Sequence, residues 1–121
     1  MKEDLKYGIV IEDSKIPRLL SIFISIKGIT LWPFIIVKGK ANERLITHER
    51  IHICQQRELF VVPFYILYVI FWIKNIFKFW GDKDLFQKAY EWIPFEREAY
   101  SNDFSQTYPI RRKKFAWISY M

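Results

Sequence analysis

The chain has 121 residues, enough for one compact domain and too few for two. Hydrophobic residues make up 51% of it and aromatic residues 19%, which excludes an intrinsically disordered protein. The net charge is +6, yet no recognition motif accompanies it, so we expect no nucleic-acid partner. These totals predict a single domain over residues 1–121.

The first residues, MKEDLKYGIV, lack the apolar run of a signal peptide. The only cysteine, Cys54, cannot form a disulfide within the chain, which is typical of proteins in a reducing compartment. We therefore expect a cytoplasmic protein, with peripheral membrane association as an open alternative.

Strand signals dominate the N-terminal third of the chain. Leu5–Ile11 is typical of a short strand, whereas Ile16–Ile26 is ambiguous, because Pro17 suits a first helical turn and the isoleucines favour a strand. Ile29–Val37 is rich in β-forming residues, and Pro33 indicates an edge or bulged strand there. A small sheet or hairpin is thus expected before the first long helix.

That helix is expected to follow a turn at Gly39–Ala41 and to run from Asn42 to Val62. Asn42 is a good N-cap, and Glu43 suits the positive end of the helix dipole. Pro63 disfavours helical geometry in the residue before it. The pattern therefore changes from β-rich to helical near residue 42.

Helices account for most of the remaining chain. The pattern predicts a helix over Pro63–Trp80 that ends at Gly81, a short helix over Asp84–Tyr90 and another over Pro94–Asn102. We therefore expect an α+β fold that is mainly helical.

The C-terminal tail, from Thr107, is basic and aromatic, and Pro109 interrupts it. Residues 111–114 are all Arg or Lys. We expect a solvated basic tail, with contact to anionic lipid or to an acidic partner as the alternative. Three apolar side chains can fold back onto the domain: Phe115, Trp117 and Ile118.

The stretch Leu59–Ile73 contains only uncharged, mostly apolar residues and is shorter than the roughly 20 residues that a membrane span needs. Tyr65 and Tyr68 within it favour partial exposure or hydrogen bonding over contact with lipid chains. We expect a buried central helix. An interfacial helix over Pro63–Trp80, which contacts a membrane surface together with the basic tail, is the second interpretation, and a membrane span is the third.

The motif HERIH, residues 48–52, lies inside the first predicted helix. Its histidines, the only two in the chain, are four residues apart and share one helix face, where two neutral imidazoles can bind one zinc ion. Glu49 projects about 100° around the helix from His48, where it can take a proton from water and deliver it to a leaving amine. The pattern predicts a zinc site with His48 and His52 as ligands and Glu49 as the general base.

Two histidines leave zinc short of a third protein ligand. A later predicted helix offers Glu96 and Glu98, which are about 200° apart around its axis, so only one of them can face the metal. We expect Glu96, because the small Ala99 shares its face and lets the two helices approach closely. Glu98 is then expected to be a solvated carboxylate beside Arg97 or Arg50.

Two further residues follow the histidine motif. Gln55 lies three residues after His52, near the histidine face, where it can support the ligands, although a helix-surface amide is an equal interpretation. Cys54 points to the opposite side of the helix and is expected to be a small core residue rather than a ligand.

Together these motifs resemble the gluzincin clan of zinc peptidases. HERIH matches the zinc helix of the clan, and EREA, residues 96–99, matches the Glu-x-x-Ala start of its glutamate helix, as in CAAX prenyl proteases and heat-shock membrane proteases. The first Glu of that box is the third ligand in those enzymes, which corresponds to Glu96 here. Those enzymes often have an Asp after the Ala, and this Asp supports the zinc ligands. The chain has Tyr100 at that position, so this support is not expected there.

A closer similarity is to small bacterial proteins in which a strand precedes HExxHxxQ, an apolar helix and a Phe-Glu-Arg-Glu-Ala box. It covers residues 17–103, and the single-domain minigluzincins are similar in size. The resemblance implies a zincin-like minidomain in which an edge strand, here part of Ile29–Val37, aligns the substrate by backbone pairing. Tyr90, Tyr100 and Tyr108 are candidates for oxyanion stabilisation, or are simply packed aromatics.

Three functions remain open on the sequence. The first is a zinc-dependent metallopeptidase that hydrolyses a peptide or protein substrate with metal-activated water. The second is a zinc-binding structural or interaction module without catalysis, which the small size of the chain favours. The third is a membrane-surface protein in which the zinc motif is incidental. The sequence indicates neither the substrate nor the oligomeric state.

Overall fold

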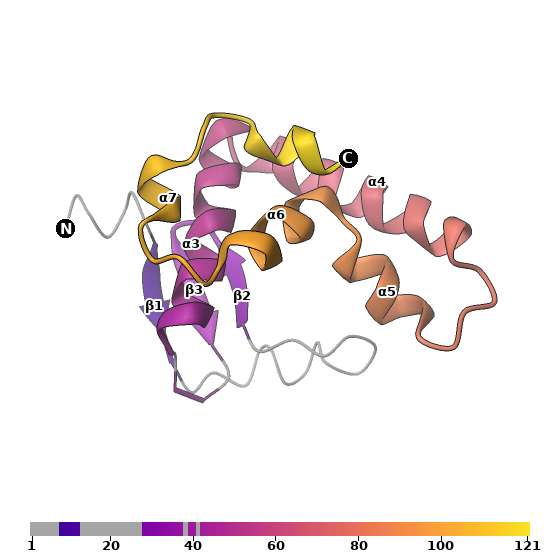
Figure 1. The fold of residues 1–121 in the computed structure, drawn as a ribbon, viewed down its shortest axis with the longest axis horizontal. Helices are drawn as coiled ribbons and strands as arrows, with labels where there is room; N and C mark the ends of the chain where they lie inside the picture. The colour runs from indigo at the N-terminus through magenta and orange to yellow at the C-terminus, as the bar shows by residue number, and fades with distance from the viewer. Residues whose placement is uncertain (1–7, 13–27, 38, 41) are drawn as a thin grey trace.

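The structure, a computed structural model, describes residues 8–12, 28–37, 39–40 and 42–121. A small sheet precedes a mainly helical body, so the predicted α+β class is confirmed (Figure 1). The ambiguous segment Ile16–Ile26 lies outside the described residues. The elements are, in chain order, β1 (Ile9–Ile11), β2 (Gly28–Leu31), β3 (Phe34–Val37), α3 (Glu43–Glu58), α4 (Val62–Lys78), α5 (Leu85–Glu91), α6 (Pro94–Asn102), α7 (Tyr108–Arg111) and the 3-10 helix η1 (Ala116–Tyr120).

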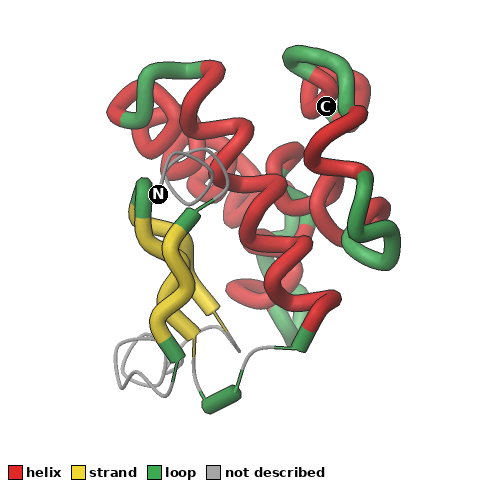
Figure 2. Tube along the Cα trace, turned by 90° about the vertical axis from the view of Figure 1, so that its left-hand side faces the viewer, coloured by secondary structure: helices red, strands yellow, loops and turns green. Residues whose placement is uncertain are grey.

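The sheet has the strand order β1-β3-β2, with β1 parallel and β2 antiparallel to the central strand β3. The sheet or hairpin expected before the first long helix is confirmed, but the expected edge or bulged strand at Pro33 is wrong. Strands β2 and β3 form a hairpin whose turn is Trp32-Pro33, joined by a cis peptide bond. Proline has no N–H to donate to a strand ladder, so it is accommodated in the turn. Figure 2 shows the strands on one side of the molecule and most of the helices on the other.

Helix α3 packs on the sheet and begins where predicted. The Asn42 side chain caps it by accepting a hydrogen bond from the backbone N–H of Leu45 at 2.8 Å. Ile35 and Val37 of β3 are fully buried and form a hydrophobic cluster with Ile53 of α3. This cluster packs helix α3, which carries residues 48–52, against the sheet.

Helix α3 ends earlier than predicted, at Glu58 instead of Val62. Phe60 and Val61 have positive φ angles of 60° and 65°, so the chain leaves helical geometry before Pro63. Pro63 lies in the first turn of α4, where its missing N–H costs no hydrogen bond. The two helices are bent by 113° relative to each other.

The later elements follow the prediction closely. Helix α6 spans the predicted residues, and α4 and α5 differ from their predicted ranges by one or two residues at each end. In the tail, Trp117 is buried in an aromatic core with Phe64 and Phe95, as expected. Phe115 and Ile118 stay 43% and 52% exposed, so the prediction that they fold back is wrong.

Helix α4 has two different apolar faces. The inner face contacts the aromatic core, and Tyr65 and Tyr68 make the hydrogen bonds expected of them. The outer face exposes large apolar side chains, so the prediction of a buried central helix is wrong for this face. These side chains are Val62, Ile66, Val69, Ile70, Ile73 and Phe77. In the described part of the chain, no single helix has the length and apolarity of a membrane span, and α3 and α4 meet these criteria only as a bent pair.

Contact between this outer face and an anionic membrane surface stays a prediction, and the exposed Lys74 and Lys78 on α4 support it. Ile70→Glu should weaken sedimentation with anionic vesicles roughly tenfold or more, the effect of removing one buried isoleucine. Phe104→Glu, a control at an exposed apolar site outside α4, should bind like the wild type. Equal vesicle binding by all three proteins would contradict the prediction.

Candidate metal centre

Two histidines of α3 and one glutamate of α6 converge inside the protein. His48 and His52 lie one helical turn apart, with ring centroids separated by 4.9 Å. The Nε2 atom of each lies 3.0 Å from the same oxygen, Oε1 of Glu96. Each side chain offers one ligand atom, and these atoms lie within 4.8 Å of one another. Because all three residues are buried, the group can hold a metal ion away from bulk solvent.

Helix α6 brings Glu96 to the histidines because it packs closely against α3. Ala99, about one turn after Glu96, is fully buried in a cluster with Ile51 of α3 and Tyr108 of α7. A larger side chain at position 99 would push the two helices apart. The small residue therefore permits the close approach that the sequence predicted.

Glu98 lies in a different buried site, which is formed with residues of the C-terminal tail. Arg112 donates to it from Nε at 2.7 Å and from Nη2 at 2.8 Å, and Tyr108 Oη adds a hydrogen bond at 2.9 Å. The expected solvated Glu98, beside Arg97 or Arg50, is therefore wrong. The expected solvated tail is also wrong at Arg112, whose side chain is only 5% exposed.

Asp103, which was not predicted as part of the site, contacts the Nδ1 side of the His48 ring. Nδ1 of His48 lies 3.1 Å from Oδ2 of Asp103, and Arg44 Nε donates to the other oxygen of that carboxylate at 2.7 Å. An ionised carboxylate only accepts, so Nδ1 carries a proton and Nε2 is the nitrogen through which His48 can bind a metal. Asp103 lies seven residues after Glu96, about two turns further on the same helix face, and this spacing is a signal that the sequence contains.

Gln55 supports His52 from the same helix. Nδ1 of His52 lies 2.8 Å from Oε1 of Gln55, which is fully buried, so the surface-amide interpretation is wrong. The Gln55 Nε2 donates to the Phe95 carbonyl and to Glu98 Oε1, both at 3.0 Å. With Nδ1 held in this way, Nε2 of His52 is the atom that faces Glu96.

Tyr68 of α4 completes the surroundings of Glu96. Its hydroxyl donates to Oε2 at 2.6 Å, which leaves Oε1 on the histidine side and favours a carboxylate ligand that uses one oxygen. A hydrogen bond from Tyr68 was expected from the sequence, but its partner was not. The two residues are 28 positions apart, and no spacing rule connects them.

The charges of the centre stabilise one another. Burial disfavours the charged imidazolium of His48, but its contacts with Asp103 and Glu96 outweigh this effect and raise its pKa to about 10. The same balance, with Glu96 as the main partner, raises the pKa of His52. Burial opposes ionisation of Glu96, yet the two histidines lower its pKa below the usual range. A metal ion brings positive charge to the same point and would replace imidazole protons there.

Glu49 is buried beside the three ligand candidates and is not one of them. Its Oε2 accepts a hydrogen bond from the hydroxyl of Thr30, on β2. Its negative charge also contributes, as the smallest of the contributing effects, to the raised pKa values of His48 and His52. A buried carboxylate is costly unless its neighbours compensate it, and here the hydroxyl and the cationic centre do so.

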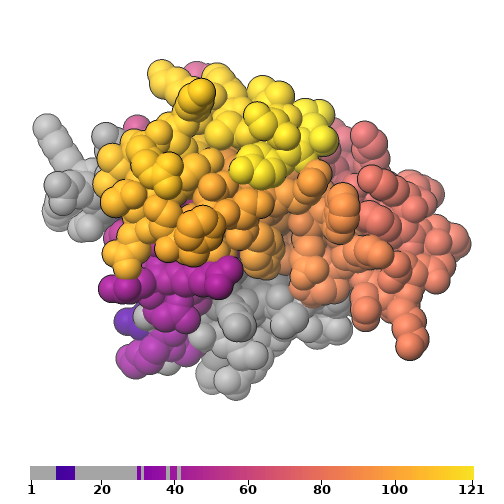
Figure 3. Space-filling view, viewed as in Figure 1, coloured from indigo at the N-terminus to yellow at the C-terminus, as the bar shows by residue number. Residues whose placement is uncertain are grey.

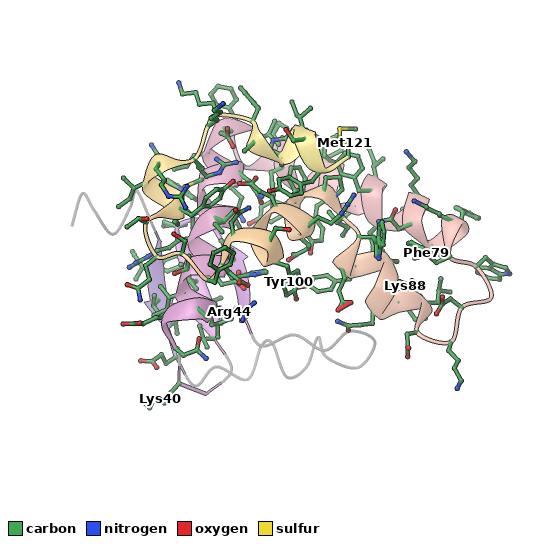
Figure 4. The ribbon with its side chains drawn as sticks, in the orientation of Figure 1. Lys40, Arg44, Phe79, Lys88, Tyr100 and Met121 are labelled. Atoms are coloured by element: carbon green, nitrogen blue, oxygen red, sulfur yellow. The ribbon has the colours of Figure 1, made fainter. Side chains whose placement is uncertain are left out.

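The three tyrosines considered for oxyanion stabilisation lie in different places. Tyr108 is bound to Glu98 and takes no part in the centre. The ring of Tyr100 packs against His48, with centroids 4.4 Å apart, and its hydroxyl lies 3.3 Å from that of Tyr90. Tyr100 is 42% exposed and therefore borders the centre from the surface. Figure 4 labels its side chain on α6.

Side chains of α3 and α4 form hydrogen bonds with the backbone of the edge strand β2 and of the turn that follows it. Gln56 accepts from the N–H of Trp32 at 3.0 Å and donates to the carbonyl of Thr30 at 3.1 Å. The Tyr65 hydroxyl also donates to that carbonyl, at 3.1 Å. A substrate strand can pair with this part of Ile29–Val37 only if it displaces these side chains.

Comparison of the chain with protein-family models, with curated proteins and with solved structures finds no match. The function must therefore be argued from the residues themselves. What they offer is a buried group of two imidazoles and one carboxylate, His48, His52 and Glu96, that can hold a metal ion.

Proposed function

We propose that the protein is a zinc-dependent metallopeptidase of the gluzincin type. His48, His52 and Glu96 are the proposed ligands, since two imidazoles and one carboxylate are a common set in catalytic zinc sites. Three protein ligands leave one position for water or substrate, whereas structural zinc is usually bound by four. The observation that carries the proposal is the buried Glu49 carboxylate beside this incomplete ligand set.

Glu49 is the proposed general base. Zinc, when bound, supplies a Lewis acid that polarises the substrate carbonyl and makes water more acidic. Glu49 takes a proton from the attacking water and passes it to the leaving amine, which regenerates the carboxylate. Because Thr30 holds Oε2 of Glu49, Oε1 is left for this proton transfer.

The neighbours of the ligands support the same assignment. Asp103 and Gln55 each contact an Nδ1 atom, an arrangement that keeps both Nε2 atoms available to a metal. In the gluzincin pattern an Asp often follows the Ala of the glutamate box, where this chain has Tyr100. Asp103, nearly one helical turn further on, can provide that support instead.

A non-catalytic zinc-binding structural or interaction module is the second candidate, and the depth of the site favours it. His48, Glu49, His52 and Glu96 are 5%, 4%, 5% and 3% exposed. Gln56 already pairs with the strand edge that would align a peptide. Such a protein would bind zinc and cleave nothing.

Removal of the metal distinguishes the two candidates. We expect about one zinc per chain and cleavage of some members of a broad peptide library, measured by metal analysis and mass spectrometry. A chelator should abolish the cleavage, and one equivalent of zinc should restore it. Zinc retained with every peptide intact would favour the non-catalytic module, and failure to bind zinc would reject both candidates.

A further inference from the structure

Gln55 orients His52, and the groups that orient Gln55 lie beyond the metal centre. The two ends of an amide side chain have nearly the same shape, so its other neighbours decide whether its oxygen or its NH2 group faces His52. The NH2 group meets two groups that only accept hydrogen bonds, the Phe95 carbonyl and the Glu98 carboxylate, both at 3.0 Å. The amide oxygen is therefore directed toward Nδ1 of His52.

Glu98 accepts the hydrogen bond from Gln55, and the C-terminal segment, residues 107–121, provides its other donors. Arg112 binds both of its oxygens, and Tyr108 donates to one of them. Together with Gln55, these groups give each carboxylate oxygen two donors. Glu58 of α3 is the second partner of Arg112, which donates to it from Nη1 at 2.8 Å. In Figure 3 the C-terminal segment, coloured gold and yellow, lies at the surface on the face that is viewed.

We propose that Arg112 and Glu98, acting through Gln55, form a positioning relay for the metal ligand. The relay keeps the proton of His52 on Nδ1 and directs its Nε2 lone pair to the metal. If the amide turned over, its NH2 group would favour a proton on Nε2, which blocks coordination. The relay rests on the proposed function, because its effect is on the affinity of the metal site. It also makes the C-terminal segment a requirement for tight zinc binding.

The chain offers a matched pair of variants. Glu98→Gln and Glu58→Gln each remove one carboxylate partner of Arg112 with little change in shape, but only the first changes the group that accepts from Gln55. We expect Glu98→Gln to weaken zinc binding about 10- to 100-fold, as for loss of a group that orients a ligand. Glu58→Gln should bind zinc like the wild type. The measurement is the zinc dissociation constant, from competition with a chromophoric chelator, on variants shown to be folded by circular dichroism.

Nitrogen NMR of the imidazoles reports on the Nδ1 proton of His52. This proton would not change if Glu98 only stabilised the fold. In the zinc-loaded protein, the slowly exchanging Nδ1 proton of His52 should be present in the wild type and in Glu58→Gln, and exchange faster in Glu98→Gln. The same proton exchange in all three proteins would overturn the relay.

A double variant tests whether Glu98 acts on His52 through Gln55. Gln55→Leu should weaken zinc binding by a similar factor, and adding Glu98→Gln should then have little further effect, since changes within one relay are not additive. Additive losses, or equal losses in Glu98→Gln and Glu58→Gln, would overturn the relay and leave the proposed zinc site intact. A wild-type protein that binds no zinc would reject the site and the relay together.

Discussion

Glu96→Gln should deprive the protein of most of its zinc. Glu96 supplies the negative charge of the ligand set, and its Oε1 lies 3.0 Å from the Nε2 atoms of both His48 and His52. The amide keeps the volume of the side chain but loses the charge, which leaves two strong ligands for a metal that needs at least three. We expect a loss of affinity greater than the roughly 10- to 100-fold caused by loss of a supporting neighbour. Zinc content after dialysis against a weak chelator measures it.

The matched control is Glu91→Gln, which removes an exposed carboxylate on α5 and should retain zinc. Thermal unfolding of the metal-free variants separates loss of a ligand from loss of the fold. If Glu96→Gln binds zinc as tightly as the wild type does, the proposed ligand set is wrong. Glu49, a further buried carboxylate of the centre, would then become the candidate ligand.

Most parts of the fold and site that could be predicted depend on residues close together in the sequence. Asn42 caps α3 through the N–H of Leu45, three residues away. The four-residue spacing of His48 and His52 places their rings on one helix face. Ala99 indicated that α6 approaches another helix closely. Each of these relations follows from helix geometry alone.

The features that could not be predicted depend on contacts between distant elements. Arg112 was expected in solvent because basic runs usually are, yet it lies buried between Glu58 and Glu98, which are 54 and 14 residues away. A buried arginine is tolerated only where carboxylates compensate it, and the fold alone determines where those carboxylates lie. The Trp32-Pro33 turn is a different case, since a proline between two β-rich runs is itself a turn signal.

Glu49→Gln should remove hydrolysis and leave zinc in place. The amide cannot take a proton from water, so we expect kcat/KM to fall by about 100- to 10,000-fold, the range for loss of a general base. The three ligand atoms are unchanged, and the amide oxygen can still accept from Thr30. Zinc content and peptide cleavage, measured on the same preparation, give the two readouts.

The comparison between the two glutamates decides the mechanism, because both are buried in one centre but have different proposed roles. Loss of Glu96 should remove zinc and therefore hydrolysis, whereas loss of Glu49 should remove hydrolysis alone. Thr30→Val gives an intermediate case, since it keeps the Glu49 carboxylate and removes only the hydroxyl that holds it. A Glu49→Gln protein that cleaves peptides at the wild-type rate would exclude Glu49 as the base. A Glu49→Gln protein without zinc would indicate that Glu49 is a ligand instead.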